Sequence, residues 1–136
     1  MADALYLDTS AVLRAVLESG TTPDLEARIA EAAALVTSRL SLVEAARALL
    51  RLRATGRTSE EGLADAGHAI DALWARCDLW ELTPAVCALA GQVAPQRPLR
   101  TLDALHLATY LLARRRLGAL QILTADERLA EAARGV

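Results

Sequence analysis

The sequence predicts an α/β protein whose parallel sheet is covered by helices on both faces. Short apolar runs of strand length recur along the chain, and amphipathic helical segments separate them. The length of 136 residues, with 54% hydrophobic and 24% charged residues, fits one domain over residues 1–136 built on one core. We expect a sheet of four short strands, and a fifth strand only if the last residues add a very short one.

The first half of the chain is predicted to contain two strands and four helices. Residues 4–7 form an apolar run of strand length, and from Ser10 the apolar residues recur at helical spacing until Gly20. The later periodic segments then predict, in order, a helix opened by Pro23 and running to residue 33, a strand at 35–37, a helix at 41–54, and a helix capped by Thr58 or Ser59 and running to residue 75.

The second half of the chain is predicted to contain two strands and three helices. Residues 78–82 are expected to form a strand, and Thr83-Pro84 to open a helix that ends before the prolines at 95 and 98. The remaining expected elements are a long helix at 101–117 ended by Gly118, a strand at 120–124 and a short helix at 125–133.

The charged residues restrict the chemistry that the chain can perform. All fifteen basic residues are arginine, which excludes a Schiff-base lysine and the lysine of a Walker A phosphate loop. The formal net charge of −2 excludes no class of partner. The N-terminal residues lack the pattern of a signal peptide, and no apolar run is long enough to cross a membrane. We therefore expect a cytoplasmic protein without a membrane partner.

Four acidic residues are expected at one edge of the sheet. Asp8 follows the first predicted strand and Asp126 follows the last, while Glu44 and Asp103 fall in the first turns of predicted helices. Sites in open α/β sheets form beyond the carboxyl ends of the strands, so Asp8 and Asp126 share one crevice if their strands are neighbours. The sequence thus predicts a cluster of carboxylates.

Each of these acids also has a purely structural explanation. Asp and Glu are favoured at helix starts, and Glu44 follows Ser41 at the spacing of a capping box. However, Glu44 and Asp103 lie within apolar segments, where an uncompensated charge is costly and no lysine is available to pair with it. Carboxylate oxygens suit Mg²⁺ or Mn²⁺ better than zinc. The alternative is a non-catalytic α/β binding domain whose acids only cap helices.

Four segments carry a family resemblance. They are YLDTSAV at residues 6–12, SLVEA at 41–45, LDALHLAT at 102–109 and LTADERL at 123–129. Taken together and in this order, they resemble the acidic motifs of PIN-domain ribonucleases, especially the VapC-type toxins of type II toxin–antitoxin systems. The resemblance spans almost the whole chain and implies the PIN-like fold, a three-layer α/β/α sandwich around the parallel sheet.

The resemblance also implies a role for each matching residue. An acidic quartet would hold one or two Mg²⁺ or Mn²⁺ ions and catalyse hydrolysis of RNA phosphodiester bonds, and its members would be Asp8, Glu44, Asp103 and Asp126. Ser10 and Thr124 match hydroxyl positions that orient a carboxylate or a water, with helix capping as the alternative. His106, one turn beyond Asp103, is expected in the core or behind the acids rather than as a base or ligand.

A VapC-type toxin is expected to have three partners. These are an RNA substrate, a small VapB-like antitoxin and a second copy of the chain in a homodimer. We expect a helix of the antitoxin to occupy a groove between residues 12–17 and 25–29, where apolar residues recur at helical spacing. A PIN nuclease that acts in RNA processing rather than as a toxin is the alternative.

Overall fold

The fold is built around a parallel sheet of four strands. The structure is a computed structural model that describes residues 3–136. The strands are β1 (Ala4–Leu7), β2 (Ala34–Ser38), β3 (Cys77–Trp80) and β4 (Leu120–Leu123). Their order in the sheet is β3-β2-β1-β4, so the first strand lies beside the last. The register pairs Leu7 with Leu123, the final residues of β1 and β4. The condition for bringing Asp8 and Asp126 to one crevice is therefore met.

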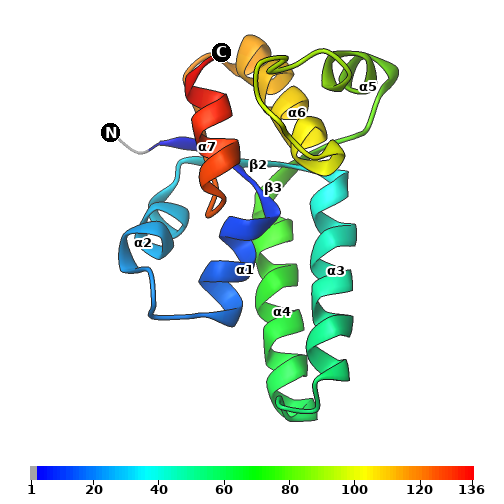
Figure 1. Cartoon of the computed structure of the whole chain (residues 1–136). Coiled ribbons are helices and arrows are strands. Elements are labelled where there is room, and N and C mark those ends of the chain that lie inside the picture. Colours follow the sequence, from blue (N-terminus) through cyan, green and yellow to red (C-terminus); the bar gives the residue numbers. More distant parts are fainter. Residues whose placement is uncertain (1–2) are drawn as a thin grey trace.

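Seven helices in the described residues connect and cover these strands (Figure 1). They are α1 (Thr9–Leu17), α2 (Pro23–Glu31), α3 (Arg39–Ala54), α4 (Glu60–Arg76), α5 (Pro84–Ala90), α6 (Thr101–Leu117) and α7 (Glu127–Arg134). Figure 1 shows α1 to α4 on one side of the sheet and α5 to α7 on the other. The predicted α/β sandwich is confirmed, and residues 3–136 contain no fifth strand.

The strands contribute to two cores because successive side chains point to opposite faces of a sheet. Leu5 and Leu7 pack with α1 to α4, whereas Tyr6 between them packs with α6 and α7. Leu35 and Val36 on β2 divide in the same way. Both faces are thus apolar, as a parallel sheet with helices on each side requires. Within residues 3–136, no helix is long and apolar enough to cross a membrane.

The start of α3 differs from the sequence prediction. We expected the helix to begin at Ser41, but it begins at Arg39 because the hydroxyl of Ser38 accepts a hydrogen bond from the Leu40 amide at 3.0 Å. Ser41 therefore lies inside the first turn, where its hydroxyl contacts that of Thr37 at 2.8 Å. The change of helix start removes the capping box predicted for Ser41 and Glu44.

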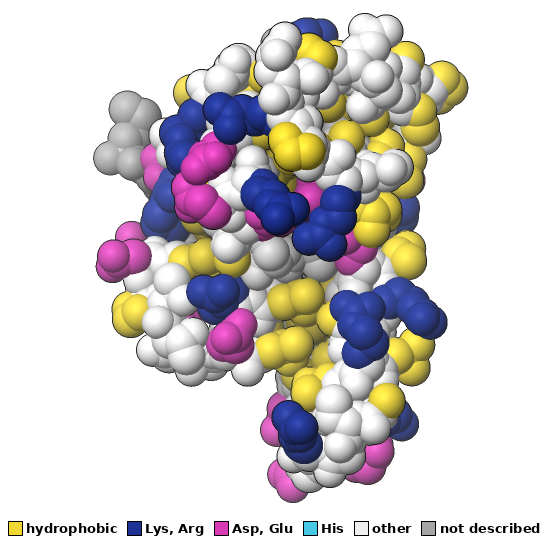
Figure 2. Space-filling model, in the orientation of Figure 1, with side chains coloured by type: hydrophobic (Ala, Val, Ile, Leu, Met, Phe, Trp, Pro, Cys, Tyr) yellow, Lys and Arg dark blue, Asp and Glu magenta, His cyan; other side chains and the backbone are white. Residues whose placement is uncertain are grey.

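Part of the groove predicted between α1 and α2 is occupied by the chain's own core. Val12, Leu25 and Ile29 are buried in the core, with at most 7% of each residue exposed. The exposed large hydrophobic residues of the long helices include Val43 and Leu50 on α3 instead. Figure 2 shows basic side chains gathered over the middle of α3, with hydrophobic side chains beside them. The antitoxin groove expected between residues 12–17 and 25–29 stays a prediction, because Leu13, Val16 and Leu17 of α1 are only partly buried.

Candidate active site

Asp8 lies directly beyond the carboxyl end of β1, next to the end of β4. Its amide donates a hydrogen bond to the carbonyl of Leu123 at 3.0 Å, which extends the pairing of the two strands by one residue. Asp8 is the N-cap residue of α1 by position, yet its side chain makes no capping bond. The residue is only 4% exposed, so its carboxylate must find partners within the protein.

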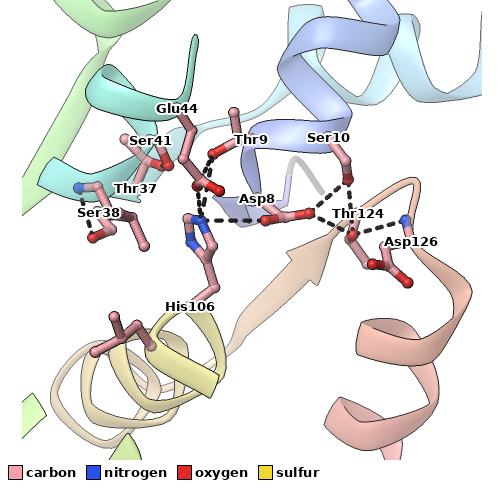
Figure 3. A network of polar contacts seen from close by, with 12 residues as sticks. Asp8, Thr9, Ser10, Thr37, Ser38, Ser41, Glu44, His106, Thr124 and Asp126 are labelled. Atoms are coloured by element: carbon pink, nitrogen blue, oxygen red, sulfur yellow. Dashed lines mark hydrogen bonds and ion pairs between the residues drawn. The ribbon is translucent and has the colours of Figure 1, made fainter. Parts of the chain in front are cut away.

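Two hydroxyl groups orient the Asp8 carboxylate (Figure 3). Ser10 Oγ and Thr124 Oγ1 donate hydrogen bonds to Asp8 Oδ2 at 2.6 and 2.7 Å, respectively. The same hydroxyls accept bonds from the amides of Ala125 and Asp126 at 2.9 and 3.0 Å. Neither hydroxyl caps a helix. Both connect β1 to the loop after β4, and the hydroxyl positions predicted from the sequence are brought together around one carboxylate.

Glu44 reaches the same site from α3. Its Oε1 accepts a hydrogen bond from Thr9 Oγ1 at 2.7 Å and lies 2.5 Å from His106 Nε2. Burial alone would raise the pKa of Glu44, but the hydrogen bonds from His106 and Thr9 lower it below its ordinary value. The carboxylate is therefore held in its charged form by groups from α1 and α6, and not by Ser41.

His106 is a central residue that we expected behind the acids. It is 1% exposed, and its Nε2 lies between Glu44 Oε1 and Asp8 Oδ1. The distance from Nε2 to Asp8 Oδ1 is 3.4 Å. On the other side of the ring, the Tyr6 hydroxyl lies 2.8 Å from Nδ1. Burial opposes protonation of His106, yet the hydrogen bond to Glu44 and the negative charges of Asp8, Glu44 and Asp103 raise its pKa above the ordinary value.

Sequence reasoning missed this arrangement of His106. The only available signal was its position one turn after Asp103, which identifies a helix face but not a partner on a distant strand or helix. Tyr6 and Thr9 were also missed. Tyr6 is fully buried in the middle of β1, and Thr9 is the first residue of α1. Both act on His106 or Glu44 through contacts that span 35 to 100 residues.

Asp126 and Asp103 occupy a more open part of the site. Asp126 caps α7, because its Oδ1 accepts a hydrogen bond from the Arg128 amide at 2.9 Å. The structural explanation therefore holds for Asp126, whose amide also bonds Thr124. Asp103 lies in the first turn of α6 and is only partly buried.

Asp103 is nevertheless electrostatically linked to its neighbours. Desolvation and the negative charges of Asp126 and Asp8 raise its pKa, and Arg100 only partly opposes this shift. No arginine in residues 3–136 forms an ion pair with Asp8, Asp103 or Asp126. Arg100 and His106 thus offset only part of the repulsion that raises the pKa of Asp103.

The donor chemistry of the site suits a hard divalent cation. Carboxylate oxygens reach this edge of the sheet from four chain segments, and the repulsion felt by Asp103 is what a bound cation would relieve. In residues 3–136, no three His, Cys, Asp or Glu side chains are already arranged closely enough to hold a metal ion. The four acids therefore lie at one edge of the sheet without forming a closed coordination shell.

The sequence matches the PIN domain family over residues 5–135. The chain belongs to the PIN domain family. PIN domains are generally nucleases, which are hydrolases, and the four-stranded parallel sheet with helices on both faces is the PIN-like fold. No match was found among curated proteins.

Two solved structures have the same fold as this PIN domain. One is PAE2754 from Pyrobaculum aerophilum, with a TM-score of 0.66 and 23% identity over 100% of this chain and 83% of the other. The second is VapBC2 from Rickettsia felis bound to a DNA fragment from their promoter. It has a TM-score of 0.59 and 12% identity over 90% of this chain and 99% of the matched chain.

Proposed function

We propose that this PIN domain is a metal-dependent endoribonuclease that hydrolyses RNA phosphodiester bonds. The observation that carries the proposal is the orientation of the buried Asp8 carboxylate by Ser10 and Thr124, beside a charged Glu44. Gathering carboxylates costs stability where, as at Asp103, nearby cationic side chains offset only part of the repulsion, so this arrangement favours a functional reason for the cluster. The nuclease character of the family supports the same conclusion.

The carboxylates of Asp8, Glu44, Asp103 and Asp126 would hold one or two Mg²⁺ or Mn²⁺ ions. A bound divalent cation supplies positive charge that offsets the charge of the phosphodiester and favours ionisation of the attacking water. Ser10 and Thr124 keep one oxygen of Asp8 fixed, while His106 and Thr9 fix one oxygen of Glu44. The other carboxylate oxygen of each of these two residues is thus already oriented before a cation binds, because the side chain is held in one rotamer.

The principal rival function is a non-catalytic binding domain whose acids only cap helices. Of the four acids, only Asp126 makes a capping bond. Asp8 and Glu44 bond to side chains of other segments, and Asp103 follows an N-cap residue, Arg100, that makes no side-chain cap. Helix capping therefore leaves three of the four acids unexplained, which favours the nuclease.

We further propose that the chain is the toxin of a toxin–antitoxin pair. The support is the order of the motifs and the fold shared with the Rickettsia felis VapBC2 complex. On this proposal a small VapB-like antitoxin and a second copy of the chain are its protein partners, and the cell interior is its location. The alternative is a role in RNA processing. Expression with and without the neighbouring gene distinguishes the two roles, because cells tolerate a toxin only when its antitoxin is made as well.

The test of the nuclease proposal uses Asp8→Asn, which keeps the shape of the side chain and removes its charge. We expect RNA cleavage in Mg²⁺ or Mn²⁺ to fall roughly a thousandfold or more, because a metal ion contributes several kcal/mol of charge stabilisation. Thermal stabilisation by millimolar Mn²⁺ should be lost in the same variant. Cleavage by purified Asp8→Asn at the wild-type rate, with folding confirmed by circular dichroism, would exclude Asp8 from the active site.

A further inference from the structure

A cleft on α3 opens beside Glu44. It has a volume of about 300 Å³ and is lined by Leu40, Val43, Glu44, Arg47, Arg51 and Leu102. Leu102 directly precedes Asp103, so the cleft brings together a segment of α3 and the first turn of α6, each of which carries an acid of the candidate site. A ligand in this cleft would therefore touch Glu44 and extend away from the acids along α3.

The charge of the cleft comes from two arginines that are not paired with acids. Arg47 and Arg51 follow Glu44 by three and seven residues, which places all three side chains on one face of the helix. Both arginines are exposed, and neither forms an ion pair within residues 3–136. Other arginines of this helix do form pairs, since Arg39 contacts Glu81 and Arg53 contacts Glu60.

The cleft is close enough to the acids to affect them electrostatically. The positive charge of Arg51 is one of the causes that lower the pKa of Glu44. The cleft also has an apolar side, where Val43 and Leu102 are 57% and 46% exposed, respectively. A ligand that fits the cleft therefore carries negatively charged groups spaced to reach both Arg47 and Arg51, with an apolar surface next to them.

Single-stranded RNA has this combination of properties. Guanidinium groups bind phosphate oxygens through two parallel hydrogen bonds, and unpaired bases present flat apolar faces to side chains. An acidic peptide would match the two arginines, but its carboxylate side chains present no flat apolar face to Val43 and Leu102. A strand of RNA instead places its next phosphodiester at the acids while its flanking phosphates lie on α3.

We propose that the cleft formed by Val43, Arg47, Arg51 and Leu102 binds a single-stranded segment of the RNA substrate next to the scissile bond. This inference rests on the nuclease function proposed above and adds the path of the substrate. It also explains how a chain with acids at its site retains a polyanion, because the two arginines supply attraction about one to two helical turns from Glu44.

The experiment measures binding of a fluorescent single-stranded oligoribonucleotide by anisotropy in the Asp8→Asn background, where cleavage is absent. Arg47→Gln/Arg51→Gln should lower affinity about tenfold at low salt. It should also reduce the slope of log affinity against log salt by about 1.4, because each lost phosphate contact accounts for about 0.7 in single strands. In the cleaving protein, the double substitution should raise KM and leave kcat within about twofold.

The matched control is Arg115→Gln/Arg116→Gln, which also removes two positive charges, but from the exposed last turn of α6. These arginines are more than three helical turns from Asp103, so we expect affinity and salt slope to stay near those of the parent. Equal losses in both double variants would show that net charge alone is responsible and would overturn the cleft proposal.

The remaining outcomes separate this proposal from the nuclease function. Unchanged affinity in Arg47→Gln/Arg51→Gln, with cleavage by the wild-type chain, overturns the cleft and leaves the nuclease intact. Absence of both binding and cleavage in the parent proteins overturns both. If the substitutions abolish binding of a co-purified protein partner while RNA affinity is unchanged, the cleft is a protein-docking surface instead.

Discussion

The two halves of the acidic site differ in how their charges are compensated. In the closed half, Asp8 and Glu44 accept hydrogen bonds from hydroxyl groups and a buried histidine. In the open half, Asp103 has a raised pKa because of desolvation and its neighbours Asp126 and Asp8. Charges that the protein satisfies itself support the fold, whereas charges left unsatisfied lower its stability until a ligand binds.

This difference suggests separate tasks for the two halves. The closed half is fixed before any ligand arrives, and within residues 3–136 no buried side-chain nitrogen or oxygen lacks a hydrogen-bond partner. The open half retains repulsion that a cation can relieve. The comparison therefore predicts that substitutions in the closed half destabilise the protein, and that neutralising an acid in the open half stabilises it.

The largest effect on stability is expected from His106→Ala. The substitution removes the group that bridges Asp8 and Glu44, and it leaves both carboxylates repelling each other in a buried setting. We expect a loss of about 3 kcal/mol in the free energy of unfolding, as for other buried pairs that lose one partner. Urea denaturation at pH 7 without metal measures it.

Tyr6→Phe is the matched control for His106→Ala. It removes the hydroxyl 2.8 Å from His106 Nδ1 and keeps the aromatic ring. The expected loss is about 1 kcal/mol, as for one hydrogen bond. If His106→Ala costs no more than Tyr6→Phe, the histidine is not what compensates the closed half, and the contrast between the halves is wrong.

A second and smaller effect is the pH dependence of the metal-free protein. Burial alone would lower the pKa of His106 in the folded state. The hydrogen bond to Glu44 and the negative charges of Asp8, Glu44 and Asp103 outweigh that effect, so the pKa is raised. Its contribution to stability is therefore fully present below an unfolded pKa of about 6.5 and is lost as the pH rises through the folded value. Glu44 has a lowered pKa, so its contribution is present above about 4.3 and lost at lower pH.

Thermal unfolding between pH 5 and pH 9, without metal, measures this dependence. We expect Tm to decrease above about pH 6.5, and His106→Gln to remove most of that decrease. A wild-type profile that is flat or rising across this range would contradict the raised pKa of His106. Persistence of the decrease in His106→Gln would assign it to another group.

The smallest expected effect has the opposite sign. Asp103→Asn removes the charge that desolvation, Asp126 and Asp8 disfavour, so the metal-free protein should become more stable near neutral pH. The gain should stay below about 1 kcal/mol, because solvent screens a partly exposed carboxylate. Differential scanning calorimetry measures it, with loss of Mn²⁺ stabilisation as the parallel readout. A clear decrease in Tm would show that Asp103 is compensated as well as Asp8.

Most of the fold could be predicted from the sequence, because hydrophobic period and helix signals are local. The strands at 4–7 and 35–37 and the helices ended by Gly20 and Gly118 lie within a few residues of their predicted positions. Errors arose where two capping residues compete. Ser38 starts α3 two residues before Ser41, and Asp126 delays α7 to Glu127.

The candidate site was predictable only in part. Asp8 and Asp126 follow neighbouring strands, which the strand-end rule anticipates. The partnership of Glu44 with His106 was not predictable, since these residues are 62 positions apart in the chain and lie on different helices. Apolar periodicity at Val12 and Leu25 likewise identified a buried face without stating what buries it, and here it is the chain's own core.

The pairing of Asp8 with Thr124 also bears on synthesis of the protein. These two residues are separated by 116 positions, and Thr124 follows β4, which is translated after the other three strands of the described sheet. A growing chain that has not yet reached β4 contains Asp8, Glu44 and His106 but lacks the hydroxyl and loop that orient the first acid. The site is therefore completed only after Thr124 has been translated, so shorter nascent fragments carry the earlier acids without their final arrangement.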